Sequence, residues 1–251
     1  MQSLIRFSSL LRFCLILMLG GAGLTVFAAT SPAAGSPAVG VERLLLVSQL
    51  PARAAALTTN VCGAINIDTT WSPINSPYDV CISGVTIGPT ATLTIQPGVT
   101  VRFENAANNK LTVRGALYAI GTLAQPITLT GIIATRGSWS GIEANNTAIA
   151  PAHVALSYVT MDYGGVNGAY GAQVYADQAV VTITHSLLRN GDSHGVYVSS
   201  TNPQANIHDT DFVSNTSNAI QLNQPRNDIL LSGLSASGNG VNAVYIAGST
   251  T

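Results

Sequence analysis

The chain repeats one short pattern four times: AQVYA at residues 172–176, HGVYV at 194–198, NAIQL at 218–222 and NAVYI at 242–246. In each copy two apolar residues enclose one polar or aromatic residue, which is the alternation of a β-strand with one buried side. The central apolar residues are spaced by 22, 24 and 24 residues and are Val174, Val196, Ile220 and Val244. Such regular spacing indicates a structural repeat.

Two further series share this period. Asparagines recur at intervals of 25 and 24 residues, at Asn190, Asn215 and Asn239. Aliphatic residues recur at intervals of 24 and 23 residues, at Ile183, Ile207 and Leu230. A period in the twenties that contains strands and turns is typical of a solenoid. We therefore predict an all-β fold, a single-stranded right-handed parallel β-helix of about seven coils with roughly 22–25 residues each.

Equivalent residues of successive coils lie above one another in such a fold, about 4.8 Å apart. Asparagine suits a stacked turn because it tolerates left-handed backbone and its amide can bond the next asparagine. We expect a structural ladder in the turns, with a carboxylate at its foot that accepts a hydrogen bond from the asparagine above. Its expected members are Asp162, Asn190, Asn215 and Asn239.

The V-x-V strands and the turn asparagines make residues 82–248 similar to the pectate-lyase-like β-helix proteins. The resemblance implies the right-handed parallel β-helix itself, a fold that hosts many functions. It also implies two kinds of enzyme. A lyase of this family uses an Arg or Lys base, commonly with Ca²⁺ held by carboxylates, and a hydrolase uses paired carboxylates.

Residues 1–29 are predicted to be a signal peptide. Arg6 and Arg12 precede an apolar run at 13–26, and the small-residue cleavage pattern follows at 26–28. The alternative, a membrane anchor, is disfavoured because the apolar run is short and contains three glycines. We therefore expect a secreted or cell-surface protein without a membrane span after cleavage.

Residues 30–60 are predicted to be a linker rich in Ala, Ser, Pro and Gly, with a possible N-terminal cap. Residues 41–57 either form a short capping helix or are disordered. The β-helix is assigned to residues 61–251, with the repeat evident from Val80 onward. The sequence stops soon after a complete strand, so we expect either a truncated chain or end-to-end self-association.

Two cysteines remain after signal cleavage, Cys62 and Cys81. An even number in an exported chain favours a disulfide, and the alternative is a pair of buried thiols. Their spacing excludes a CxxC metal site.

Charged residues make up only 8% of the chain, the net charge is −1, and Lys110 is the single lysine. This composition excludes nucleic-acid binding through a basic patch and electrostatic membrane attachment. It also offers few groups for acidic polysaccharides, which Arg and Lys normally recognise.

The exposed positions of the repeated strand are expected to form one file along the solenoid. Tyrosines in such a file can stack on sugar rings. The alternative is that tyrosine only stabilises the strand, for which it has a high propensity. The members of this candidate binding face are Glu143, Tyr175, Tyr197, Gln221 and Tyr245.

The candidate catalytic residues are Arg189, Asp192 and His194, which share one turn. His194-Gly195 resembles part of the Gly-His-Gly motif of galacturonan hydrolases, but Ser193 replaces the first glycine. The paired-Asp and Arg-Ile-Lys motifs of those enzymes are absent. The alternative is a hydrogen-bonded polar turn.

No metal site is predicted. The other histidines, His153, His185 and His208, lack metal-ligand spacing, and no carboxylates follow one another on adjacent coils to hold Ca²⁺. Calcium stays open as a cofactor on the family resemblance alone. The favoured function is a non-catalytic surface or matrix module for carbohydrate or protein binding, and the alternative is a polysaccharide lyase or glycoside hydrolase.

Overall fold

The computed structural model describes residues 58–145, 151–166, 171–199, 204–223 and 229–247. The predicted signal peptide and the possible cap at 41–57 lie outside these residues, as does nearly all of the predicted linker. The described part is a stack of parallel strands, interrupted by one 3₁₀ turn, η1 (Pro73–Asn75). None of its helices is long and apolar enough to cross a membrane.

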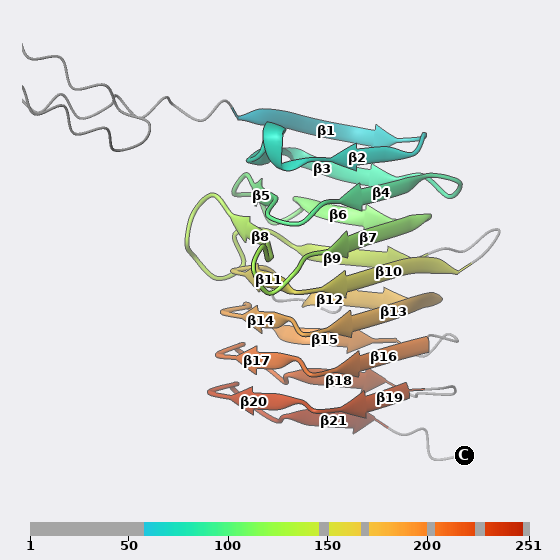
Figure 1. Ribbon diagram of the computed structural model, residues 1–251. Helices are drawn as coiled ribbons and strands as arrows, with labels where there is room; N and C mark the ends of the chain where they lie inside the picture. The colour runs from blue at the N-terminus through green and yellow to red at the C-terminus, as the bar shows by residue number, and fades with distance from the viewer. Residues whose placement is uncertain (1–57, 146–150, 167–170, 200–203, 224–228, 248–251) are drawn as a thin grey trace, which may run out of the picture. The chain divides into compact units, whose positions relative to one another are not determined.

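Each coil contributes one strand to each of three faces, which we call faces A, B and C (Figure 1). Face A contains β6 (Lys110–Val113), β9 (Gly141–Asn145), β12 (Ala172–Asp177), β15 (His194–Val198), β18 (Ile220–Asn223) and β21 (Val244–Ala247). Face B contains β2 (Thr69–Trp71), β4 (Thr92–Ile95), β7 (Ala116–Ile120), β10 (Ala152–Ser157), β13 (Ala179–Thr184), β16 (Gln204–His208) and β19 (Ile229–Ser232). Face C contains β5 (Thr100–Phe103), β8 (Ile127–Gly131), β11 (Val159–Asp162), β14 (Leu187–Arg189), β17 (Asp211–Val213) and β20 (Ser235–Ser237).

Two longer strands, β1 (Thr59–Ile65) and β3 (Tyr78–Ile87), open the solenoid and run across faces C and A. They join these faces into one 14-stranded sheet, whereas face B is a separate 7-stranded sheet. In Figure 1 the chain passes from face B in front to face C at the left and face A behind while it descends, which is a right-handed path. The predicted right-handed parallel β-helix of about seven coils is confirmed.

The core consists of columns of aliphatic side chains that point inward from all three faces. On face A, Val174 pairs with Val196, Val196 with Ile220, and Ile220 with Val244, as the spacing of the repeat predicts. In the N-terminal half of the stack, the buried rings of Phe103 and Trp139 lie nearly parallel with centroids 3.9 Å apart. Burial of these apolar columns is the main term that stabilises the solenoid.

The predicted aliphatic series is wrong at one member. Ile207 pairs with Leu231 on β19, and Leu230 pairs with Asn206 instead. Leu230 is accordingly exposed, at 58% of its maximum. Three consecutive apolar residues, Ile229 to Leu231, hide the alternation that elsewhere identifies the inward side.

The first coil also begins earlier than the repeat in the sequence indicates, because β1 starts at Thr59 rather than near Val80. The predicted disulfide is confirmed here: Cys62 on β1 is bonded to Cys81 on β3, with Cα atoms 5.6 Å apart. It therefore joins the first two strands that stack on one another. A disulfide is compatible with an extracellular location.

Candidate functional site

The exposed file on face A is in register along the coils. Tyr175 pairs with Glu143 on one side and with Tyr197 on the other, and the pairing continues through Gln221 to Tyr245. The rings of Tyr175 and Tyr197 meet edge to face, with centroids 5.4 Å apart and planes at 73°. The fold thus places aromatic and amide groups of four consecutive coils in one line.

The file is not equally accessible along its length. Tyr175 is only 8% exposed, whereas Tyr245 is 45% exposed and Tyr197 and Gln221 are half-buried. Tyr175 therefore packs against the ring of Tyr197, and its own ring is not accessible to a ligand. The accessible part, which we call the Tyr face, consists of Tyr197, Gln221 and Tyr245.

Asparagines hold two members of the Tyr face in place. The Nδ2 of Asn223 donates to the hydroxyl of Tyr197 at 3.3 Å, and the Nδ2 of Asn218 donates to Oε1 of Gln221 at 2.7 Å. Both asparagines belong to the same coil as Gln221. The sequence identified neither, because a single asparagine near a strand end gives no sign of its side-chain partner.

His194 links the two members further. Its Nδ1 accepts a hydrogen bond from the backbone N–H of Asn218 at 3.2 Å, and its ring lies edge-on to Tyr197 with centroids 5.7 Å apart. Burial lowers the pKa of His194 below the ordinary histidine value. His194 is therefore a neutral acceptor beneath the Tyr face at neutral pH.

Glu143, at the other end of the predicted file, is engaged with neighbours. Its Oε2 forms an ion pair with the Nζ of Lys110, and its Oε1 accepts a hydrogen bond from Nδ2 of Asn145 at 2.6 Å. The charges on this part of face A thus compensate one another. Beyond it, β15, β18 and β21 carry no Asp, Glu, Lys or Arg.

The candidate catalytic residues are placed on different faces. Arg189 lies on face C, where its Nε donates to Oδ2 of Asp162 at 2.8 Å across adjacent coils. His194 begins the face A strand β15. Asp192 lies in the turn between them, with its carboxylate against the backbone of Gly137.

The corner that carries this turn is covered by the segment between β8 and β9. Arg136 in that segment donates from one guanidinium nitrogen to the carbonyl oxygen of Gly191, at 3.0 Å, and to that of Ser214. Arg136 thereby spans the turns of two successive coils. Sequence reasoning did not identify this role of Arg136, because its partners are backbone atoms of distant coils.

In the predicted asparagine ladder, Asn215 is joined to Asn239, but Asn190 is not aligned with Asn215. Asn215 donates through Nδ2 to Oδ1 of Asn239 at 3.0 Å. Asn190, by contrast, has φ 54° and follows Arg189, which pairs with Val213, so Asn190 aligns with Ser214 and not with Asn215. Asp162 pairs with Arg189 on a strand and is not a turn residue. It does accept the expected hydrogen bond from Asn190, at 2.9 Å.

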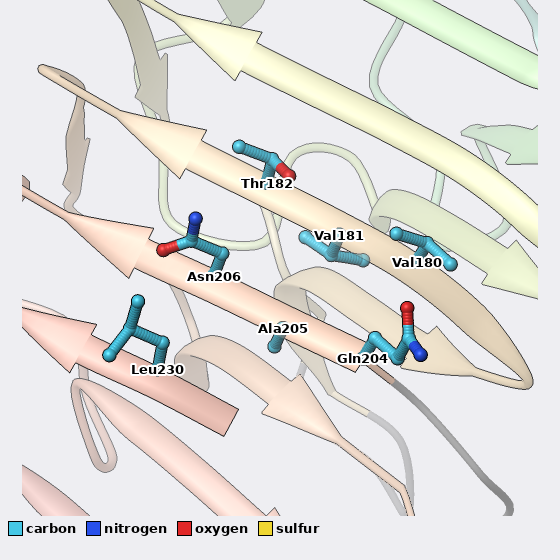
Figure 2. Close-up of a pocket in the computed structure, with 7 residues that line it drawn as sticks. All are labelled: Val180, Val181, Thr182, Gln204, Ala205, Asn206 and Leu230. Atoms are coloured by element: carbon cyan, nitrogen blue, oxygen red, sulfur yellow. The ribbon is translucent and has the colours of Figure 1, made fainter. Parts of the chain in front are cut away.

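A hollow lies on face B, and Figure 2 shows its lining on three neighbouring strands. Its volume is about 210 Å³. This is less than the roughly 300 Å³ at which small-molecule pockets begin. Its lining residues are Val180, Val181, Thr182, Gln204, Ala205, Asn206 and Leu230. This size does not fit a small-molecule pocket, so the Tyr face, with its aligned side chains, is kept as the candidate site.

Within the described residues, no group of three His, Cys, Asp or Glu side chains could hold a metal ion. Comparison with protein-family models, curated proteins and solved structures finds no match. The geometry of the described residues is therefore the basis for any functional assignment.

Proposed function

We propose that this chain is an exported, non-catalytic surface or matrix module that binds neutral carbohydrate along the Tyr face. The observation that carries the proposal is the register of Tyr197, Gln221 and Tyr245 on consecutive coils. Tyr197 and Tyr245 are two coils apart, roughly 10 Å, or twice the strand spacing. One pyranose of an extended glycan spans about one strand spacing, so two rings could stack on the two tyrosines with the Gln221 amide between them.

Charge supports a neutral ligand. The strands under the Tyr face carry no acidic or basic side chain except His194, and Glu143 and Lys110, farther along face A, are paired with each other. An acidic polysaccharide would need several Arg or Lys side chains in this place. A neutral glycan needs only ring stacking and hydrogen bonds from amide and hydroxyl groups.

The alternative, a polysaccharide lyase or glycoside hydrolase, has less support. Catalysis needs a base and charge-stabilising groups that converge on one reacting bond. Arg189 is paired with Asp162 on face C, and the Nδ1 of His194 already accepts a backbone hydrogen bond on face A. A non-catalytic module that binds a protein at the same face is the other alternative.

The experiment is a binding and product assay with the purified chain. Amorphous cellulose and xylan represent neutral glycans, and polygalacturonate represents acidic ones. We expect retention on a neutral glycan and no unsaturated or shortened products. Unsaturated products from polygalacturonate would establish the lyase alternative, and retention on none of the three would contradict carbohydrate binding.

Export is tested separately from binding. Expressed with its own N-terminus in a secreting host, the chain should appear outside the cytoplasm with its N-terminus near residue 29, because the cleavage pattern at 26–28 would be used. N-terminal sequencing of the recovered protein decides this. Retention of residues 1–29 in a cytoplasmic product would contradict it.

A further inference from the structure

His194 occupies a position that asparagine occupies in the following coils. His194, Asn218 and Asn242 are equivalent in the register of β15, β18 and β21. Asn218 uses its side-chain Oδ1 to accept the backbone N–H of Asn242 at 3.0 Å, just as His194 uses Nδ1 to accept the backbone N–H of Asn218. The two side chains therefore accept equivalent hydrogen bonds from the next coil. Of the two, only the histidine can lose its acceptor atom by binding a proton.

Two members of the Tyr face are connected to His194. The first is Tyr197, whose ring lies against the imidazole. The second is Gln221, since it accepts a hydrogen bond from the Asn218 side chain and His194 accepts from the backbone of the same Asn218. A proton on Nδ1 would leave the Asn218 N–H without its acceptor and place a positive charge beside Tyr197.

We propose that His194 is a pH-sensitive positioning residue of the Tyr face: its neutral ring holds Tyr197 and, through Asn218, Gln221 in the arrangement that binds glycan, and protonation releases both. The regulatory role rests on the proposed function of this face. Burial is consistent with it, because a desolvated imidazole is neutral over most of the physiological range.

Among the described residues, few other titratable groups lie near His194. β12 contributes Tyr175 and Asp177, its own strand contributes Tyr197, and Asp192 lies two residues before it. β18 contributes no titratable side chain. A transition in mildly acidic solution is therefore assigned to His194 by its absence from His194→Asn.

The test compares three full-length chains on amorphous cellulose between about pH 7.5 and about pH 4.5. They are the wild type, His194→Asn, and His185→Asn as a control for an exposed histidine at another corner. The wild type and His185→Asn should lose affinity by up to about tenfold per pH unit below the pKa of His194, whereas His194→Asn should keep its affinity. An equal acid-induced loss in His194→Asn would overturn the proposal.

A ligand-free measurement separates this proposal from the proposed function. In NMR spectra of the wild type recorded over a range of pH, the chemical shifts of the Asn218 backbone amide and the Tyr197 ring should change with the same midpoint pH as those of His194. In His194→Asn these chemical shifts should not change over that range. If Asn218 or Tyr197 titrated with a midpoint different from that of His194, the proposal would be overturned even if the chain binds cellulose. If the midpoints coincide but Tyr197→Ala with Tyr245→Ala leaves cellulose retention intact, the binding function fails and the His194 switch stands.

Discussion

Gln173 donates a hydrogen bond through Nε2 to Oδ1 of Asn215 at 2.8 Å, although the two residues lie two coils apart. The intervening coil has Gly191 at the ladder position, and a Cβ there would come within 3.1 Å of the Gln173 side chain. The long glutamine thus crosses the space that the glycine leaves and continues the buried ladder toward the N-terminus. All of this lies inside the solenoid, since Gln173 and Asn215 are both almost fully buried.

Asn215→Ala should lower the free energy of unfolding by about 2–4 kcal/mol, because it leaves several buried hydrogen-bond partners unpaired at once. Its Oδ1 accepts from Gly191 N–H and from Gln173, and its Nδ2 donates to the carbonyl of Leu188. Urea unfolding monitored by circular dichroism measures the change. Asn108→Ala, at an exposed position, is the control. Equal unfolding midpoints for the two variants would show that the ladder contributes nothing.

Arg136→Ala should release the segment between β8 and β9 from the corner turns. The guanidinium binds two carbonyl oxygens but is exposed, so the loss of stability should be modest, about 1 kcal/mol. The sharper readout is limited proteolysis, which should cut within residues 132–137 faster than in the wild type. Thr135→Ala, at a neighbouring exposed position, should leave the cleavage rate unchanged. Faster cleavage in both variants would point to loop composition instead.

Replacement of both cysteines by serine should destabilise the first coil. In the chain-entropy treatment, a loop of this size contributes about 3 kcal/mol. Thermal unfolding of the double variant Cys62→Ser with Cys81→Ser should resemble that of the wild type in reductant. A wild-type transition that does not move on reduction would mean that the β1–β3 pairing stands without the bond.

Stability should fall in mild acid because of His194. Its pKa is lower in the folded state, so the unfolded chain binds more protons and the free energy of unfolding decreases as the pH falls below about 6.5. The decrease ends once the pH is below the folded-state pKa. His194→Asn should remove this part of the pH dependence, which paired urea titrations at several pH values can measure. A slope unchanged in His194→Asn would assign it to other groups.

The architecture was predictable because strands such as VYV and VYI alternate without ambiguity and recur at a fixed interval. Where alternation fails, as in Ile229 to Leu231, the pattern does not distinguish one strand register from the next. Leu230 was therefore predicted to face the core, a position that Leu231 occupies. Asn190 shows a second limit. Asparagine is favoured both at a left-handed turn residue and at the following ladder position, for different physical reasons, so identity alone does not say which one it occupies.

The site was predictable only in part. Its file of outward residues follows from strand alternation, whereas the burial of Tyr175 and the supporting roles of Asn218, Asn223 and His194 depend on contacts between coils. These contacts are set by side-chain direction at strand ends, which a periodic pattern does not encode. The placement of Arg189 and His194 on different faces likewise could not be predicted without knowing where the chain turns from face C to face A.

The central claim is that the Tyr face binds glycan without catalysing its cleavage, and two tyrosines test it most directly. The measurement is retention on amorphous cellulose of Tyr197→Ala with Tyr245→Ala, compared with Tyr118→Ala, an exposed tyrosine on face B. The double variant should remain folded and lose more than about tenfold in affinity, since two ring contacts together contribute at least about 1.4 kcal/mol. Tyr118→Ala should bind like the wild type. Unchanged retention in the double variant, together with loss in Arg189→Ala or Asp192→Ala, would contradict the account and place the site at the turn.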